Sequence, residues 1–254
     1  MYPVSLFYAL ISTNVKVALR DYYKHLGVEM SFYTYFEHSR IFAITMVDRF
    51  ITKADPKAYT FVYDDYERPL EIFSNATILL LSHFGGWAAS SNSSRSTNVM
   101  NIVMQEALKD GIKDIEDNLG YKSTQKIIDI NKGPIAVSIA IANALMQNEV
   151  VAIMGDRASN PNATIAVEFL GEKALFNKNP FQIAYKMKTP LVAYFVMLRG
   201  PQEYKVEFIE IKMDYEKKAN EAIEEAVQEY VKKYEEVIHR YPNQWFNLYE
   251  FWKK

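Results

Sequence analysis

Two short apolar runs, each followed at once by a polar loop that contains glycine, constrain this chain more than any other feature. Ala76–Leu81 precedes the loop Ser82–Trp87, and Glu149–Met154 precedes Gly155–Arg157. Short apolar runs between turn signals are typical of strands that are buried on both faces of a parallel sheet. The two runs therefore predict central strands of a covered sheet.

Strand-like and helix-like segments alternate along the rest of the chain. Further strands are predicted over Val99–Gln105, Lys126–Ile130, Ala166–Leu170, Leu191–Arg199 and Tyr204–Ile211, and Thr60–Asp64 is either a short strand or a helical turn. Helices are predicted over Trp87–Ser91, Glu106–Leu119, Pro134–Gln147, Pro180–Met187 and Tyr215–Arg240. Gly200-Pro201 predicts a tight turn between the last two strands. The alternation predicts an α/β fold with a mixed, mostly parallel sheet that is flanked by helices and preceded by an N-terminal helical segment.

A single domain over residues 1–254 accommodates all of these elements. The chain has 254 residues, 49% of them hydrophobic, which suffices for one sizeable core. We expect N-terminal helices with possible membrane contact over 1–55, an α/β core over 75–212, and a C-terminal helix with an aromatic tail over 213–254.

Two segments are candidates for contact with a membrane surface. Tyr2–Ala18 has the pattern of an amphipathic helix, which either lies on a membrane or packs on the domain. The tail is rich in aromatic residues, and packing over the core is the favoured alternative for it. No run reaches the roughly 18 apolar residues of a membrane-spanning helix, and a signal peptide is not expected.

Several function classes are disfavoured by composition and by missing motifs. The net charge of −2 shows no basic excess of the kind that nucleic-acid binding needs. The absence of cysteine excludes disulfides and a thiolate nucleophile. No pair of histidines has metal-ligand spacing, and neither a Gly-x-Ser-x-Gly elbow nor a nucleotide-binding glycine loop is present. We therefore expect no metal site and no nucleic-acid partner.

His83 is the main candidate for chemistry because it lies where a buried strand ends. In open α/β sheets, ligands bind beyond the carboxyl ends of the strands. An imidazole can accept a proton near neutral pH, and the N–H groups of Gly85 and Gly86 could face a developing oxyanion. A histidine that only caps the next helix fits the spacing equally well.

Asp156 and Arg157 follow the second buried run. Arg157 could bind a phosphate or carboxylate of a lipid headgroup or acyl carrier, with Asp156 orienting either Arg157 or His83. On these two residues alone, an ordinary salt-bridged strand end is the favoured alternative.

Five ordered segments resemble the bacterial lipid A biosynthesis acyltransferases of the lauroyl/myristoyl type, within the lysophospholipid acyltransferase superfamily. The segments are Ser82–Trp87, Met154–Arg157, Val167–Gly171 with Ala174–Phe176, Phe181–Pro190, and Tyr241–Phe246 with Phe251-Trp252. Together they span roughly Ala76 to Trp252.

The resemblance implies a peripheral acyltransferase on the cytoplasmic face of the bacterial inner membrane. It implies a donor thioester of acyl carrier protein or coenzyme A, a hydroxyl or amine of a lipid or glycolipid as acceptor, and no further cofactor. His83, Asp156 and Arg157 would be catalytic, with His83 as the general base. The implied substrate-binding residues are Phe84, Gly85, Gly86, Trp87 and Gly155.

Ala88 departs from the family pattern, which usually has an acid five positions after the histidine. Either another acid orients His83, with Asp156 as the first choice, or His83 acts alone, or the chain is catalytically silent and binds lipid or a partner protein. A third hypothesis, an unrelated α/β hydrolase, is disfavoured by the missing nucleophile elbow.

Overall fold

The computed structural model describes residues 12–90, 98–105, 125–158 and 160–252. The predicted helix over Glu106–Leu119 and residues 2–11 of the candidate membrane segment Tyr2–Ala18 lie outside these ranges.

The described residues form a seven-stranded sheet in the order β1-β9-β8-β2-β5-β3-β4. Every pair of neighbouring strands is parallel except the hairpin β8–β9, which turns at the predicted Gly200-Pro201. The strands are β1 Thr60–Tyr63, β2 Thr77–Leu81, β3 Met100–Met104, β4 Gln125–Asp129, β5 Val150–Met154, β8 Leu191–Gly200 and β9 Glu203–Ile211. The mixed, mostly parallel α/β sheet is confirmed.

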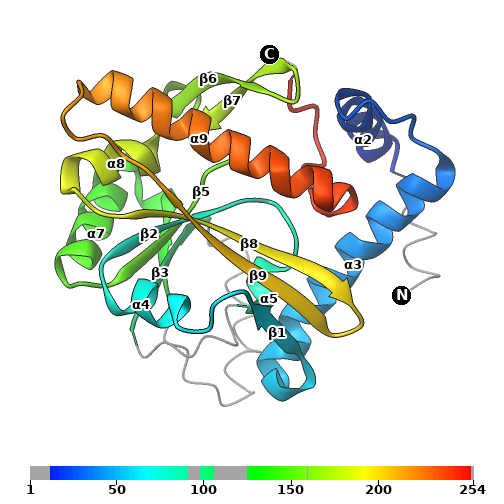
Figure 1. The fold of residues 1–254 in the computed structure, drawn as a ribbon, viewed down its shortest axis with the longest axis horizontal. Helices are drawn as coiled ribbons and strands as arrows, with labels where there is room; N and C mark the ends of the chain where they lie inside the picture. The colour runs from blue at the N-terminus through cyan, green and yellow to red at the C-terminus, as the bar shows by residue number, and fades with distance from the viewer. Residues whose placement is uncertain (1–11, 91–97, 106–124, 159, 253–254) are drawn as a thin grey trace.

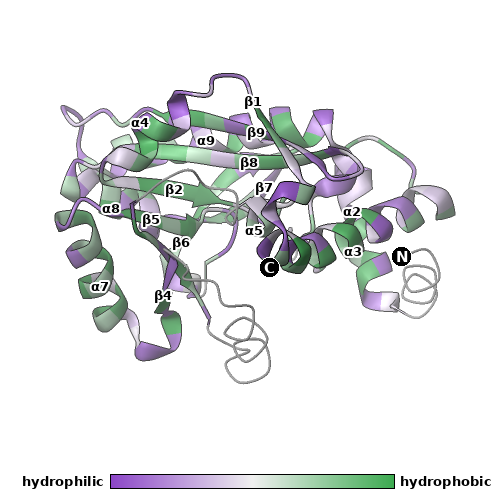
Figure 2. Cartoon of the chain, turned by 90° about the horizontal axis from the view of Figure 1, so that it is seen from below, coloured by the Kyte–Doolittle hydropathy of each residue, from purple (hydrophilic) through white to green (hydrophobic). Residues whose placement is uncertain are grey.

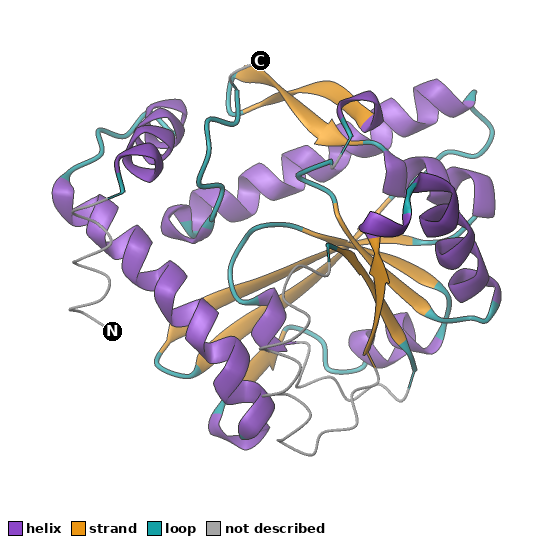
Figure 3. Cartoon of the chain, turned by 180° about the vertical axis from the view of Figure 1, so that it is seen from behind, coloured by secondary structure: helices purple, strands orange, loops and turns teal. Residues whose placement is uncertain are grey.

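Helices flank the sheet, and α9 runs along one side of it (Figures 1 and 3). The helices are α2 Thr13–His25, α3 Phe32–Ala54, α4 Arg68–Ser74, α5 Trp87–Ser90, α7 Pro134–Met146, α8 Asn179–Met187 and α9 Ala219–Arg240. A separate antiparallel hairpin pairs β6 Thr164–Phe169 with β7 Glu172–Asn177. The N-terminal helical segment is confirmed for α2 and α3.

Strand β2 shows how the core is divided between the two faces of the sheet. Successive side chains of a strand point to opposite faces. Ile78 and Leu80 accordingly join one core cluster with residues of α9, whereas Leu79 and Leu81 join another with residues of α4 and α5. Burial of each such side chain stabilises the fold by about 1.5–3 kcal/mol, and Figure 2 shows β2 and β8 as mainly hydrophobic.

The aromatic tail packs into the core. Trp245 is fully buried, and Phe251 and Trp252 are each only 8% exposed. The tail residues Trp245, Phe251 and Trp252 are therefore not available to a membrane surface, and the core-packing alternative is confirmed for them. Among the residues described, no helix is long and apolar enough to cross a membrane.

His38 of α3 is fully buried and links the N-terminal helices to the C-terminal tail. Its Nε2 donates to the carbonyl oxygen of Trp245 at 2.9 Å, because a carbonyl can only accept. Its Nδ1 then accepts from the Tyr23 hydroxyl at 3.1 Å. Burial lowers the pKa of His38 to about 4.

This buried histidine is expected to make the protein less stable in acid. Above pH 6.5 His38 is neutral in both the folded and the unfolded protein. Between pH 6.5 and pH 4 the unfolded chain binds a proton at His38, whereas the folded protein does not, because its pKa there is about 4. The free energy of unfolding should therefore fall by about 3 kcal/mol between pH 7 and pH 4 on this account. Denaturant titrations across this range, on the wild type and on His38→Gln, test the expectation. The decline should be smaller by about 3 kcal/mol in His38→Gln than in the exposed control His239→Gln, whereas equal declines in both variants would exclude His38 as a cause.

Candidate active site

His83 and Asp156 lie side by side because the strands that precede them are neighbours. Strands β2 and β5 are parallel, with Leu81 in register with Met154. Each strand is followed two residues later by one of the two side chains. The backbone N–H of His83 donates to Asp156 Oδ2 at 2.8 Å, and His83 Nδ1 lies 3.1 Å from Asp156 Oδ1. The carboxylate thus fixes both the backbone and the ring of the histidine.

This contact also determines which ring nitrogen is available for chemistry. A carboxylate accepts, so Nδ1 of His83 carries the proton and Nε2 keeps a lone pair. Nε2 has no hydrogen-bond partner among the described residues, and the side chain of His83 is 33% exposed whereas that of Asp156 is 2% exposed. A buried acid that holds a partly exposed imidazole is the arrangement of a general base with its orienting residue.

The two groups stabilise each other's charged forms. The negative charge of Asp156 raises the pKa of His83, outweighing the opposing effects of burial and of the Arg157 charge. Burial alone would raise the pKa of Asp156, but its charge interaction and hydrogen bonds with His83 lower it overall. Tyr234 of α9 adds a hydroxyl 3.3 Å from Asp156 Oδ2. Asp156 is therefore an ionised buried carboxylate at neutral pH.

His83 has an acid beside it although Ala88 stands where the family usually has one. Ala88 lies in the short helix α5 after the histidine loop, while the Nδ1 side of His83 is occupied by Asp156. Of the alternatives that the sequence left open, the geometry agrees with Asp156 as the orienting acid.

The expected oxyanion role of Gly85 and Gly86 is wrong. The N–H of Gly85 donates to the carbonyl oxygen of Gln244 at 2.8 Å, and the N–H of Gly86 donates to that of Val196 at 2.8 Å. Both donors are used within the fold. The glycines are required instead for close approach, since a Cβ on Gly86 would lie 2.3 Å from the ring of Tyr204.

Gly85→Ala is expected to destabilise the protein by about 3 kcal/mol or more. Gly85 has φ +60°, and an added Cβ would lie 1.8 Å from the backbone oxygen of Val196. Gly27 has φ +71° with no atom within 4 Å of the added Cβ, so Gly27→Ala isolates the backbone cost of about 1–2 kcal/mol. Denaturant unfolding of both variants gives the comparison, and equal losses would show that the Val196 contact costs nothing.

The remaining predicted binding residues have mainly structural surroundings. Phe84 is 1% exposed and packs against Phe195 and Tyr234, so its ring does not face the site. Gly155 allows the Tyr230 ring to approach, because a Cβ there would lie 2.9 Å from it. Only Trp87 remains partly exposed among these three residues.

Trp87 lines a small apolar cavity on the face of the sheet opposite α9. The volume within which the centre of a water molecule can lie is about 20 Å³, so the cavity has room for about one water. Its other lining residues include Phe73, Leu81, Ile102, Tyr194 and Phe208. A fatty acyl chain would enter this space only if the lining side chains moved apart.

Arg157 is exposed and stacks on Tyr249 of the tail. Its guanidinium carbon lies 3.9 Å from the centre of the Tyr249 ring, a cation–π contact. Arg157 makes no ion pair within the described part of the chain, so the salt-bridged strand end is wrong. The cation is held next to the His83–Asp156 pair and remains open to an anion.

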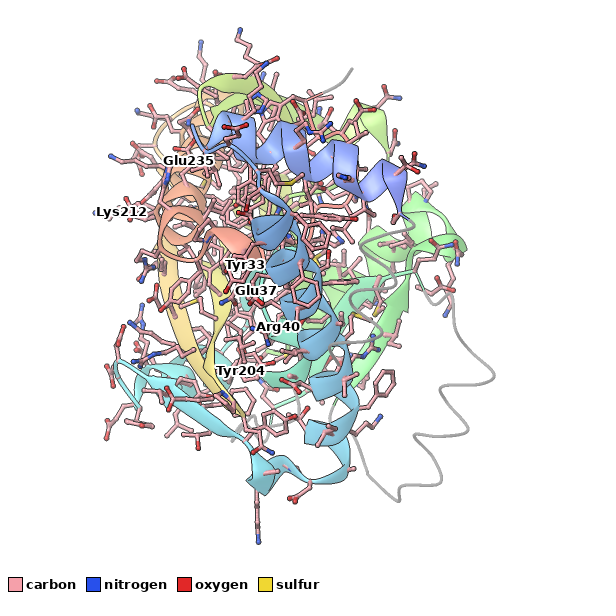
Figure 4. All side chains as sticks on the ribbon, turned by 90° about the vertical axis from the view of Figure 1, so that its right-hand side faces the viewer. Tyr33, Glu37, Arg40, Tyr204, Lys212 and Glu235 are labelled. Atoms are coloured by element: carbon pink, nitrogen blue, oxygen red, sulfur yellow. The ribbon has the colours of Figure 1, made fainter. Side chains whose placement is uncertain are left out.

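Sequence reasoning missed three residues that support this site. These are His38, Tyr204 and Gln244, and only Gln244 lies in one of the segments that resemble the family, Tyr241–Phe246. Tyr204 lies beside α3 (Figure 4), and its hydroxyl donates to the buried Asp48 of that helix. Their contacts join residues that are far apart in the chain, and only the motif at Gln244 gave a signal.

Comparison with models of protein families gives a match over most of the chain. The family model described as "Bacterial lipid A biosynthesis acyltransferase" matches residues 74–254. No curated protein matches the sequence. The matched range holds β2, β5 and the tail, and therefore His83, Asp156 and Arg157.

Proposed function

The chain belongs to the bacterial lipid A biosynthesis acyltransferase family, and we propose that it moves a fatty acyl group from a thioester to a lipid acceptor with His83 as general base. The donor is a thioester of acyl carrier protein or coenzyme A, and the acceptor is a hydroxyl or amine of a lipid or glycolipid. The contact between His83 and Asp156 is the observation that carries this proposal.

In the proposed mechanism the acyl group passes directly from the donor to the acceptor. Nε2 of His83 takes the proton of the acceptor hydroxyl or amine as its oxygen or nitrogen attacks the thioester carbonyl carbon. The carbon–sulfur bond then breaks, and the imidazolium returns the proton to the departing thiolate. Asp156 stabilises the imidazolium in between. The reaction requires no metal and no redox cofactor.

Arg157 is proposed to bind the substrate through charge. Its exposed guanidinium can form paired hydrogen bonds with a phosphate or carboxylate of the lipid headgroup or acyl carrier. Stacking on Tyr249 holds the guanidinium in one place before substrate arrives, which reduces the entropy lost on binding.

We further propose that the protein works at the cytoplasmic face of the inner membrane as a peripheral protein. Helix α3 supports this, because it exposes large apolar side chains to solvent. These are Phe32, Tyr33, Met46, Val47, Phe50 and Ile51. Flotation with anionic phospholipid vesicles tests the proposal, and a full-length protein that stays with the soluble fraction contradicts it.

The test of function is direct transfer. The purified protein is incubated with radiolabelled acyl-carrier-protein and acyl-coenzyme A thioesters and with lipid A precursors, lysophospholipids or total lipid extract. Acyl transfer to a lipid product is expected. The wild type and His83→Ala are compared with each donor, and equal rates would remove the mechanism.

The alternative is a catalytically silent protein that binds lipid on the same scaffold, as Ala88 first suggested. On this alternative the wild type binds acyl chains but transfers none of them, whichever thioester donor is supplied. The placement of Asp156 beside His83 supports the enzyme over this alternative.

A further inference from the structure

The C-terminal segment Gln244–Phe246, here called the clasp, pairs with the loop that carries His83. The N–H of Phe246 donates to the carbonyl oxygen of His83 at 2.7 Å, and the N–H of Gly85 donates to that of Gln244 at 2.8 Å. Phe84 and Trp245 form an antiparallel bridge between these bonds. The clasp therefore fixes the backbone on the side of His83 that Asp156 does not reach.

The side chain of Gln244 attaches the clasp to the central sheet. Strand β2 is in register with β8 only over Leu191–Ala193, so the later residues of β8 have no strand on that side. The amide of Gln244 fills this edge, accepting from the N–H of Leu198 at 2.9 Å and donating to its carbonyl oxygen at 2.7 Å. Gln244 is 3% exposed. Its side chain takes the place of a peptide group and continues the sheet past the end of β2.

Two more contacts make the attachment rigid. The N–H of Gly86 donates to the carbonyl oxygen of Val196, two residues before Leu198 on the same edge of β8. On the other side, His38 donates to the carbonyl oxygen of the buried Trp245. The His83 loop and the clasp are thus held between β8 and α3.

We propose that Gln244 is a positioning residue that sets the orientation of the His83 ring through the clasp. This inference rests on the proposed role of His83 as the base. Without the two bonds to Leu198 the clasp loses its connection to β8, and the carbonyl of His83 loses a fixed donor. A displacement of about 1 Å at a reacting group lowers a rate by roughly 100-fold.

The test compares Gln244→Met with Gln228→Met. Methionine keeps the length of glutamine but removes both hydrogen bonds. Gln228 is an exposed glutamine of α9 that also donates to a backbone carbonyl, that of Glu168 at 3.3 Å, so its variant controls for the loss of such a bond. Gln244→Met is expected to lower kcat by about 10–100-fold with KM changed less than about threefold.

Two readouts are independent of turnover. Amide hydrogen exchange at Gly85 and Phe246 is expected to become at least about tenfold faster in Gln244→Met. NMR titration of the His83 ring is expected to show its pKa moving from its raised value toward 6.5, since the ring no longer keeps its place beside Asp156. Gln228→Met should match the wild type in both.

The outcomes separate this inference from the proposed function. If the wild type shows no acyl transfer, the proposed function is wrong, and the amide exchange rates and the His83 titration still test whether Gln244 positions the ring. If Gln244→Met folds and has the exchange rates and the His83 pKa of the wild type, the inference is wrong. If Gln244→Met does not fold, amide exchange and the His83 titration are measured on Gln244→Glu instead, because its carboxyl group keeps an acceptor for the N–H of Leu198. Failure of both variants to fold would make Gln244 a folding residue and also overturn the inference.

Discussion

His83→Ala is expected to lower kcat for acyl transfer by about 10³–10⁴-fold, since it removes the only group placed to take the acceptor proton in the proposed mechanism. Binding of the acyl donor should change little, because His83 acts on the proton and not on the thioester. The measurement is steady-state transfer with a saturating donor, together with donor affinity by calorimetry.

His239→Ala is the matched control for that loss. His239 is an exposed histidine near the end of α9, so its removal tests the assay without touching the site. Thermal unfolding should show that both variants remain folded. A His83→Ala rate within about threefold of wild type would mean that another group is the base.

Asp156→Asn is expected to lower kcat by about 10²–10⁴-fold at neutral pH. The amide can still accept from the backbone N–H of His83, but its NH₂ can face Nδ1 only if Nδ1 gives up its proton. The proton then moves to Nε2, which can no longer act as a base. Combining the variant with His83→Ala should cost no more than His83→Ala alone, because the two residues act as one unit.

The pH dependence of the transfer rate is a second test of Asp156→Asn. The rate of the wild type should rise as pH increases through the pKa of His83, which lies above 6.5 because Asp156 favours the imidazolium. Asparagine carries no charge, so the acid limb of kcat/KM should move to lower pH. An acid limb that stays in place in Asp156→Asn would show that this pair does not control the titration.

The sequence could place His83 and Asp156 at one site because the rule for parallel sheets is general. Two buried runs each ended in a polar loop, and both loops had to meet at the carboxyl edge. The rule cannot predict which acceptors the backbone N–H groups of the His83 loop bind. Gly85 and Gly86 looked free for an oxyanion, yet Val196 and Gln244, which accept their bonds, lie far along the chain.

Local signals also failed in two elements of the fold. Helix α4 was not predicted, because proline often interrupts a helix, yet Pro69 stands in the first turn of α4, where proline is well tolerated. Strand β7 was missed despite a turn at Leu170 and Gly171, both with positive φ, which links it to β6. Its alternation places Ala174 and Phe176 inside and leaves Leu175 44% exposed, so a two-residue period was present over a short stretch.

The pairing of His83 with Asp156 also governs when activity can appear during folding. The two residues are 73 positions apart in the chain, and the clasp that pairs with the same loop comes from near its far end. Contacts of such high sequence separation form slowly, because the entropy of closing long loops must be overcome first. Recovery of catalysis after dilution from denaturant would then report completion of the whole tertiary structure, later than the return of helical circular dichroism.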